Sequence, residues 1–311
     1  MTTLDSTVRA PAEPDASWLR RLAPLGTALI WGVNIPVMKG AVGHAHPFAF
    51  NALRLTLTVV VLAWLEQRAR ARGTRARATG ATTRWVPIVL LSILSGFLYQ
   101  VLFLSGLGLT SAGHTSVLIG SSPLWTALLA RWAGMERHGR GVWIALGVAF
   151  AGTVCVVWSP SGTASLRGDL LVLGAALAWA FGAVVSRRLL DDVSPLRLAY
   201  LFALIALPFN WAVAIPTHDW STLGSLPPAF WGAVVYSGVF STGVAYVLWN
   251  QGLVALGPAR TAVYVNLVPV IAIVLAWVTL GEHIGGVQLV GAALVIGGLA
   301  SSQRLQATER T

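Results

Sequence analysis

The stretch LFLSGLGLTSAGHTSVLIGSSPLWTALLA (102–130) holds two apolar runs joined by a short polar turn. It recurs 146 positions later as LWNQGLVALGPARTAVYVNLVPVIAIVLA (248–276). A similar offset of 148 relates the first apolar run of each half. Shared Trp and Pro residues at nearly one spacing indicate an internal duplication. The matched pairs include Gly106 with Gly252, Thr115 with Thr261, Pro123 with Pro269, and, at the second offset, Trp31 with Trp179.

Composition places the chain in a membrane. Hydrophobic residues make up 56% of the 311 residues and charged residues only 10%, whereas a soluble domain carries roughly 25% charged residues. A helix needs about 20 mostly apolar residues to cross the hydrocarbon core, and barrel strands would show short alternating segments instead. The predicted spans are 22–42, 47–67, 86–108, 112–132, 141–158, 169–189, 196–215, 229–251, 258–280 and 284–301.

Five crossings per repeat is an odd number, so the two halves must have opposite orientations in the membrane. Inverted repeats of this kind build transporter sites near mid-membrane that can open to either side. We therefore expect an all-α membrane protein with ten transmembrane helices, arranged as two inverted five-helix repeats around a central cavity. The expected domains are an N-terminal tail (1–21), a first repeat (22–158), a second repeat (169–301) and a C-terminal tail (302–311).

The net charge of +10 orients the chain in the membrane. Eighteen of the 21 Lys and Arg residues fall on one side of the predicted topology, the exceptions being Lys39, Arg54 and Arg167. The positive-inside rule then predicts cytoplasmic termini in a multi-pass cell-membrane (inner-membrane) protein. The basic loop 68–85 has Trp85 as its only aromatic residue, so it fits contact with lipid headgroups better than nucleic-acid binding. No signal peptide is expected in the polar segment 1–17.

Several stretches resemble the EamA family of the drug/metabolite transporter superfamily, whose members carry two copies of a five-helix unit. The resemblance covers both halves, and it implies export of a metabolite through a central cavity; the amino-acid and aromatic-metabolite exporters are the branch it suggests. The matching stretches are ALIWGVNIPVMKGAV (28–42), HPFAFNALRLTL (46–57), the opening motif (102–130), LVLGAALAWAFGAVVSRRLL (171–190) and VFSTGVAYVLWNQGLVALGPARTAVYVNLVPVIAIVLAWVTLGE (239–282).

Helical spacing predicts which side chains share a face toward the cavity, because positions three or four apart lie on one stripe. These stripes combine aromatic rings with neutral hydrogen-bonding groups. Such a lining suits a substrate that is part apolar and part polar. The alternative is that the Trp and Tyr residues pack in the bundle or lie in interfacial belts. The predicted substrate-binding residues are Trp31, Asn34, Tyr99, Phe103, Ser121, Trp125, Trp179, Tyr246, Asn250, Tyr264 and Asn266.

Three further residues are interpreted as gating elements. Pro123 and Pro269 interrupt their spans at matching positions, and each frees a backbone carbonyl that a cavity can satisfy; a static kink is the alternative. Arg54 lies seven residues after Pro47, about 10 Å along its helix. An intramembrane charge indicates function, either attracting a carboxylate or stabilising a closed gate. The alternatives are a structural arginine and one that reaches the headgroups.

Acidic residues and histidines limit the mechanism. Glu66, Glu136, Asp169 and Glu282 fall at span ends or in loops, so no buried carboxylate relay for protons is expected. His114 lies beside a short turn and is expected at the membrane interface. Transport driven by the substrate's own gradient is therefore favoured over drug/proton antiport.

Classes other than carriers are less well supported. The six histidines have no repeating ligand spacing, so we expect no metal, cofactor or catalytic centre and no enzyme activity. A channel would rest on rings of carbonyls or charges. Cys155 is the only cysteine, so no internal disulfide is possible. The expected partners are a small-molecule substrate and membrane lipid but no nucleic acid, with the chain as a monomer or homodimer.

Overall fold

The computed structural model describes residues 17–72, 85–134, 139–157, 165–256, 264, 267–281 and 285–308, and all regular structure within them is helical. Ten helical segments in these residues correspond to the ten predicted spans. Five of them are long and apolar enough to cross a membrane unaided: Pro47–Ala71, Trp85–Leu109, Leu166–Leu189, Pro195–Thr217 and Pro228–Ala255. The prediction of an all-helical membrane fold is confirmed.

The first half contains five helical segments, and two of them are irregular. The third segment is helical throughout but changes to π-helix in its middle, and the fourth segment is broken in two. Its elements are α1 (Ser17–Ala41), α2 (Pro47–Ala71), α3 (Trp85–Leu91), η1 (Ser92–Leu98), α4 (Tyr99–Leu109), α5 (Ala112–Gly120), α6 (Ser122–Trp132) and α7 (Arg140–Val157).

The second half repeats this order. A short 3-10 turn, η2 (Trp220–Ser225), precedes its third segment. The elements are α8 (Leu166–Leu189), α9 (Pro195–Thr217), α10 (Pro228–Val235), η3 (Tyr236–Val244), α11 (Ala245–Leu256), α13 (Leu267–Leu280) and α14 (Gly286–Thr308).

Helix starts follow from local sequence. Ser194 caps α9 by accepting a hydrogen bond from the backbone N–H of Arg197, and Pro195 is the first helical residue. His46 and Pro47 occupy the same two positions at the start of α2. A cap oxygen satisfies a free N–H of the first turn, and proline fits there because its own missing N–H is not needed. The caps therefore begin the second helix of each half in the same way.

The two π-helical segments fall at equivalent places in the two halves. The repeat offset of 146 carries 92–98 onto 238–244, within η3, and a tyrosine, Tyr99 or Tyr246, follows each segment closely. In the wider π turns some carbonyls accept hydrogen bonds from side chains of other helices. Asn210 donates to the Gly96 carbonyl, and Thr58 donates to the Gly238 carbonyl. π-Helix is rare and is found mostly at functional sites.

Pro123, one of the two prolines predicted to interrupt spans, lies at a helix start. The fourth segment breaks at Ser121, and Pro123 belongs to the first turn of α6. A proline there removes no helical hydrogen bond, because the first N–H groups of a helix have no partner within it. Pro269 lies in α13, whose described residues begin at Leu267. Gly120 faces Pro269 so closely that an added Cβ would lie 2.7 Å from the proline ring.

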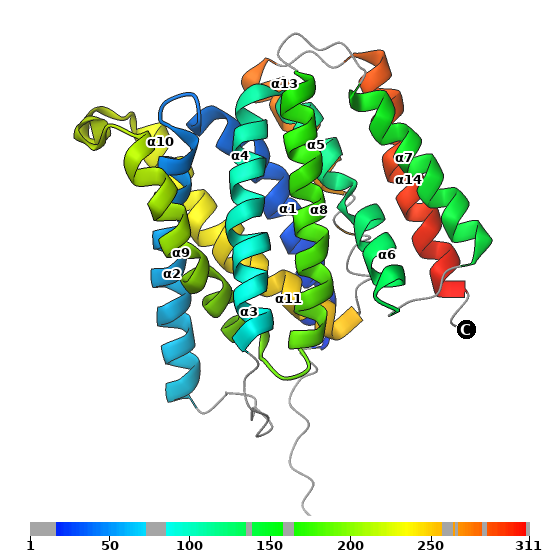
Figure 1. Ribbon diagram of the computed structural model, residues 1–311, viewed down its shortest axis with the longest axis horizontal. Coiled ribbons are helices and arrows are strands. Elements are labelled where there is room, and N and C mark those ends of the chain that lie inside the picture. Colours follow the sequence, from blue (N-terminus) through cyan, green and yellow to red (C-terminus); the bar gives the residue numbers. More distant parts are fainter. Residues whose placement is uncertain are drawn as a thin grey trace, which may run out of the picture.

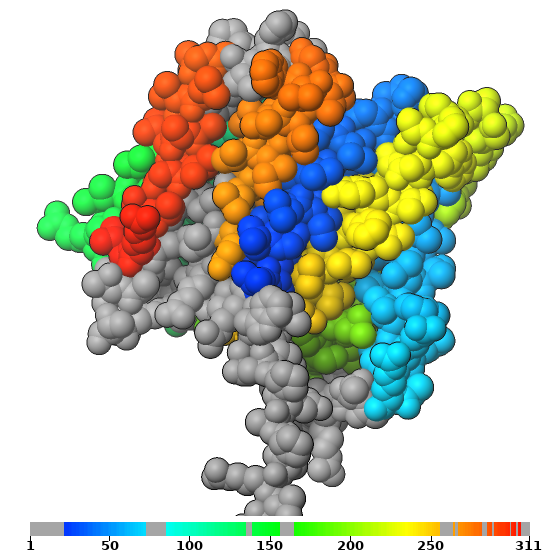
Figure 2. Space-filling view, turned by 180° about the vertical axis from the view of Figure 1, so that it is seen from behind, coloured from blue at the N-terminus to red at the C-terminus, as the bar shows by residue number. Residues whose placement is uncertain are grey.

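The helices form one bundle with a paired edge. Figure 1 shows α7 and α14 side by side at one edge, α2, α9 and α10 at the other, and α1 and α8 between them. From behind, α1 lies between α13 on one side and α11 on the other (Figure 2). Helices from the two halves therefore interleave in the bundle instead of forming separate lobes.

The two ends of the bundle differ in charge. Arginines gather at the lower end in Figure 1, where α2, α6 and α8 finish and α9 begins; we call it the basic end. There Glu66 accepts from Arg70 at 3.1 Å and lies 3.9 Å from Arg197, which joins α2 to α9. At the opposite end, Lys39 donates to the carbonyls of Leu107 (2.7 Å) and Thr110 (2.6 Å). Lys39 therefore holds the end of α4 instead of only reaching the headgroups.

Candidate substrate-binding cavity

A cavity of ≈180 Å³ lies inside the bundle, and both halves contribute to its walls. This is slightly larger than the roughly 150 Å³ apolar cavity that accepts benzene in an engineered protein. A compact molecule with a single ring is therefore of suitable size. The wall includes aromatic, polar and charged residues from both halves: Trp31, Asn34, Arg54, Tyr99, Gln100, Phe103, Pro123, Trp179, Arg187, Thr242, Tyr246 and Trp249.

Aromatic rings form the centre of this wall. The ring of Trp179 lies 5.4 Å from those of Trp31 and Tyr99, 6.0 Å from Tyr246 and 6.4 Å from Trp249, measured between centroids. Most of these pairs are edge-on or tilted, which the charge distribution of aromatic rings favours. The repeat partners Trp31 and Trp179 thus face each other across the junction of the halves.

The π-helical segment η3 positions two of the wall residues. Trp31 donates its indole N–H to the Ser241 carbonyl at 3.0 Å, and Ser237 donates to the Asn34 side-chain oxygen at 2.6 Å. The Trp31 ring is therefore fixed by a hydrogen bond whose acceptor belongs to the other half of the molecule. The polar atoms of Trp31 and Asn34 are thus hydrogen-bonded to η3, while the Trp31 ring lines the cavity.

Arg54 is buried in the cavity wall, with 3% of its surface exposed. Its Nε donates to Asn51 at 2.9 Å, one Nη to Gln100 at 2.6 Å, and the other Nη to the Thr242 hydroxyl at 3.4 Å. The expectation of an arginine reaching the headgroups is wrong for this residue, because all its partners lie inside the bundle. Asn51 in turn donates to Asn210 of α9 at 2.6 Å, which anchors the group.

Six of the predicted binding residues line the cavity: Trp31, Asn34, Tyr99, Phe103, Trp179 and Tyr246. Two predicted gating residues, Arg54 and Pro123, line it as well. Their roles in binding and gating stay predictions.

Five predicted residues do not belong to this wall. Ser121 is buried, donates to the Leu118 carbonyl and accepts from the Trp125 indole at 3.2 Å. Asn250 donates to the Pro195 carbonyl, Tyr264 packs against the neighbouring apolar core, and Pro269 abuts Gly120. The prediction for Ser121 and Trp125 assumed one regular helix. The helix break at Ser121 changes the direction in which the following side chains point, so they no longer share a face with the residues before it. Asn266 lies outside the described residues.

Some wall residues were not among the predicted binding set. Trp249 shares a helical stripe with Tyr246, which is a signal the sequence carries. Gln100 is the only amide side chain in the apolar run 86–108, and a polar residue in such a run could have marked it. Arg187 ends α8 and sits at the repeat position of Lys39.

The cavity is closed at one end of the bundle. This end lies opposite the basic end. Phe50 and Phe230, whose ring centroids lie 5.8 Å apart, belong there to a buried apolar cluster that also contains Met38 and Leu107. The cavity wall extends toward the basic end, where it includes Arg187 in the last turn of α8.

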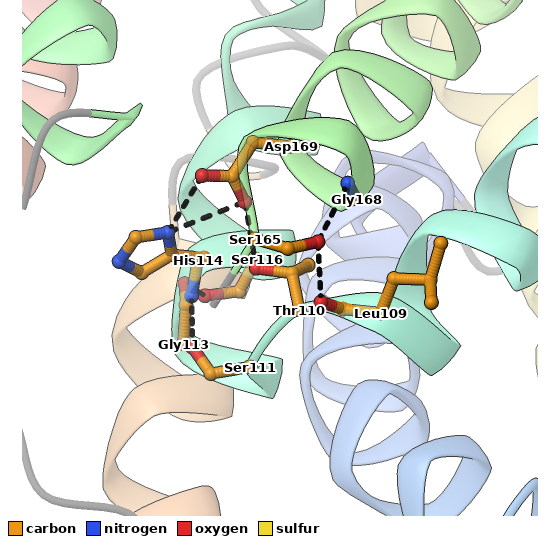
Figure 3. A network of polar contacts seen from close by, with 9 residues as sticks. All are labelled: Leu109, Thr110, Ser111, Gly113, His114, Ser116, Ser165, Gly168 and Asp169. Atoms are coloured by element: carbon orange, nitrogen blue, oxygen red, sulfur yellow. Dashed lines mark hydrogen bonds and ion pairs between the residues drawn. The ribbon is translucent and has the colours of Figure 1, made fainter. Parts of the chain in front are cut away.

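A separate polar network joins the two halves near the closed end (Figure 3). Thr110 donates to Asp169 at 2.6 Å, and the Nδ1 atom of His114 lies 3.0 Å from the other carboxylate oxygen. Ser165 caps α8 and also donates to the Leu109 carbonyl at 2.9 Å. The network therefore fixes the α4–α5 corner to the start of α8.

This network adds to two expectations. His114 has no exposed surface and Asp169 is 1% exposed, so His114, which was expected at the membrane interface, has a fully buried side chain. Asp169 does lie in the first turn of its helix, as expected, but it is a buried carboxylate. The pairing was hidden because the two residues are 55 positions apart in the sequence. Neither residue lines the cavity.

Metal binding has no support in the described residues, which contain no group of three or more His, Cys, Asp and Glu side chains arranged to hold an ion. The only cysteine, Cys155, is a free, partly buried thiol in α7.

Known proteins share this sequence pattern and fold. The chain is 28% identical over 284 residues to the transporter YyaM of Bacillus subtilis, covering 89% of this chain and 91% of that protein. It is 28% identical over 292 residues to a WAT1-related chloroplastic protein of Arabidopsis thaliana, covering 90% of this chain and 67% of that protein. One solved crystal structure has the same fold, with a TM-score of 0.65 at 21% identity over 94% of this chain and 99% of that one. The profile of the EamA-like transporter family matches residues 21–158 and again residues 166–302. With one match in each half, the chain is a multi-pass membrane transporter that belongs to the EamA-like transporter family.

Proposed function

We propose that the protein exports small amphipathic metabolites, namely amino acids or related compounds, by alternating access around the aromatic cavity. One observation carries the proposal. A single cavity is walled by rings from both halves, with Trp31 and Trp179 facing each other at 5.4 Å. A site at the junction of inverted repeats can be exposed to either side by rocking one half against the other.

The charge asymmetry supports an orientation with both termini in the cytoplasm. The basic end carries Arg68, Arg131, Arg187 and Arg197, and basic residues are retained on the cytoplasmic side. In this orientation the cavity extends toward the cytoplasm and is closed toward the outside by the cluster around Phe50 and Phe230. A substrate exported from the cell would enter this state first.

The cavity wall also supports transport without proton coupling. Among the described residues that line it there is no Asp, Glu or His, although proton-driven carriers commonly use a buried carboxylate in their pathway. Two buried carboxylates, Asp169 and Glu66, favour the alternative, a proton-coupled drug exporter. Neither lines the cavity, so the alternative is the weaker candidate.

Counterflow in proteoliposomes tests the proposal. Purified protein is reconstituted, and uptake of labelled amino acids and cationic dyes is measured with and without unlabelled substrate inside and with and without a pH gradient. A carrier shows uptake that internal substrate stimulates, and an uncoupled carrier shows the same stimulation when the pH gradient is collapsed. Passage of substrate without stimulation would indicate a channel, and strict dependence on the gradient would indicate proton antiport.

A further inference from the structure

The Arg54 guanidinium has hydrogen-bonding capacity that its protein partners do not use. It carries five N–H donors, and its three nitrogens make one hydrogen bond each, to Asn51, Gln100 and Thr242. One N–H on each terminal nitrogen is therefore left over. Arg54 lines the cavity, so a ligand there can reach this side chain.

No carboxylate of the described residues balances the charge of Arg54. Its three hydrogen-bond acceptors are neutral amides and a hydroxyl, and none of the described Asp and Glu residues lies within 4 Å of its nitrogens. Its contact with the Phe50 ring, at 5.6 Å from the centroid, adds no negative charge. A buried charge is costly unless it is paired, and the missing partner is an anion.

The donors and acceptors of the surrounding hydrogen bonds also favour an anion beside Arg54. A guanidinium can only donate, so the side-chain oxygen of Gln100 must face Arg54. The Gln100 amide nitrogen is then left as a second donor beside the cavity, and no described group accepts from it. The Gln100 oxygen accepts from Arg54, so the groups of this pair that have no described partner are N–H donors.

The charged residues of the wall, among those described, are Arg54 and Arg187, and none of these described wall residues is Asp or Glu. A cation placed beside Arg54 would meet like charge and aromatic rings, whereas an anion there would meet the Arg54 guanidinium. The rings of Trp31, Trp179 and Trp249 provide the apolar remainder of the wall.

We propose that Arg54 and Gln100 form an anion-binding subsite, and that the transported molecule is a small carboxylate with an aromatic or apolar body. The proposal rests on the proposed function and narrows it to one chemical class. A planar carboxylate matches the paired N–H groups of a guanidinium, and the cavity of ≈180 Å³ leaves room for about one ring. A free ammonium group is not required, because no described carboxylate is present to bind it.

A charge series on one ring tests the class without any substitution. The compounds are 3-phenylpropanoate (an anion), phenylalanine (a zwitterion) and phenethylamine (a cation), which share a phenyl ring and a two-carbon chain. Ligand-induced stabilisation of the detergent-solubilised protein reports binding, because a ligand that binds only the folded state raises its Tm. The expected result is stabilisation by 3-phenylpropanoate, at least equal to that by phenylalanine, and none by phenethylamine.

Substitutions then assign the effect to these residues. Gln100→Glu is nearly isosteric and gives Arg54 an internal counter-ion, so it should abolish stabilisation by 3-phenylpropanoate. Arg54→Gln should weaken its binding by about tenfold or more, the usual effect of losing hydrogen bonds to a charged group. Arg54→Lys, which keeps the charge but not the fork, should be intermediate. Arg68→Gln is the matched control, since Arg68 lies on the same helix but is exposed and stacks on Trp64.

The outcomes separate this proposal from the proposed function. Equal stabilisation by phenethylamine, or full carboxylate binding by a folded Gln100→Glu protein, overturns the anion subsite. If proteoliposomes exchange other compounds while no carboxylate binds, the subsite is wrong and the transporter proposal stands. Should no compound of any charge show stimulated exchange, the proposed function fails and the carboxylate class fails with it.

Discussion

Trp179 lies at the centre of the cavity's aromatic side chains, in contact with rings from α1, α4 and α11. It is partly exposed although it lies within the bundle, and it lines the cavity, so a ligand there can contact its side chain. An aromatic side chain in this position provides a wall for an apolar body and an indole N–H for a polar group.

Replacing Trp179 with Ala should reduce stimulated exchange by about fivefold or more, since one aromatic contact is worth about 1 kcal/mol beyond its buried area. Exchange in proteoliposomes and the yield of monodisperse protein are measured together. Trp132→Ala is the control, because Trp132 is 90% exposed. If Trp179→Ala protein is not recovered folded while the control is, Trp179 serves packing and not the substrate.

The His114–Asp169 pair makes a stability prediction at the same scale. His114→Leu leaves the buried Asp169 with Thr110 as its remaining described side-chain partner, and taking a hydrogen-bond partner from a buried polar group costs about 1–3 kcal/mol. The Tm in detergent should fall clearly. Asp169→Asn should cost less, because the amide oxygen can still accept from Thr110. The double variant should be less destabilised than the sum of the two, since the residues act as a pair; additive effects would show that they do not.

Sequence reasoning found charged and aromatic residues but not their partners. Arg54 stands out as a charge in an apolar span, yet Gln100 and Thr242 lie 46 and 188 positions away. Neither pairing follows from spacing along one helix. Asp169 was predicted at a span end, which is where it lies, but its burial depends on the α4–α5 corner that packs against it. Local pattern thus identifies the element, and tertiary packing decides the environment.

At the scale of elements, the spans were predicted and their irregularities were not. The break at Ser121 and the π-helical segments η1 and η3 all occur in runs that read as continuous apolar helix. Hydrophobicity reports that a segment is buried in lipid or protein, but it does not report the hydrogen-bonding register of the backbone. Side chains from other helices, such as Thr58 and Asn210, help to satisfy the π-helical carbonyls.

The α7–α14 pair depends on glycines that coincide in the repeat. A Cβ at Gly152 would lie 2.6 Å from the Gly291 carbonyl oxygen, and one at Gly298 would lie 2.6 Å from the Ala145 carbonyl oxygen. Small residues allow this close approach of membrane helices. The pairing of the fifth helix of each half follows from it.

Gly152→Leu or Gly298→Leu should therefore separate α7 from α14 and lower the free energy of unfolding by ~2 kcal/mol or more, as overpacking does. Thermal denaturation in detergent gives the comparison. Gly147→Leu and Gly297→Leu are matched controls on the same two helices, because nothing lies within 4 Å of a Cβ added there. Replacing Gly with Leu raises helix propensity equally in the test variants and in the controls. If the test variants had the same Tm as the controls, the close packing of α7 against α14 would be contradicted.

At the scale of the whole molecule, the duplicated pattern predicts two repeats around a shared cavity, and the structure has Trp31 of one half against Trp179 of the other. The number and order of spans follow from hydropathy and the repeat. The shape of the cavity does not, because it depends on where helices break and on which end is closed. The closed cluster around Phe50 and Phe230 is made of ordinary apolar residues that carry no distinguishing signal in the sequence.

Alternating access makes one prediction that a cavity permanently open to one side does not share. Ser122 lines the cavity and is buried, and Cys155 is the only native cysteine, so Cys155→Ala provides a background for Ser122→Cys. A membrane-impermeant thiol reagent is applied to whole cells and to inside-out vesicles, with and without a transported ligand. We expect the new thiol to react from either face, with the ligand slowing both reactions. Reaction from one face alone under every condition would contradict a cavity that opens to both sides.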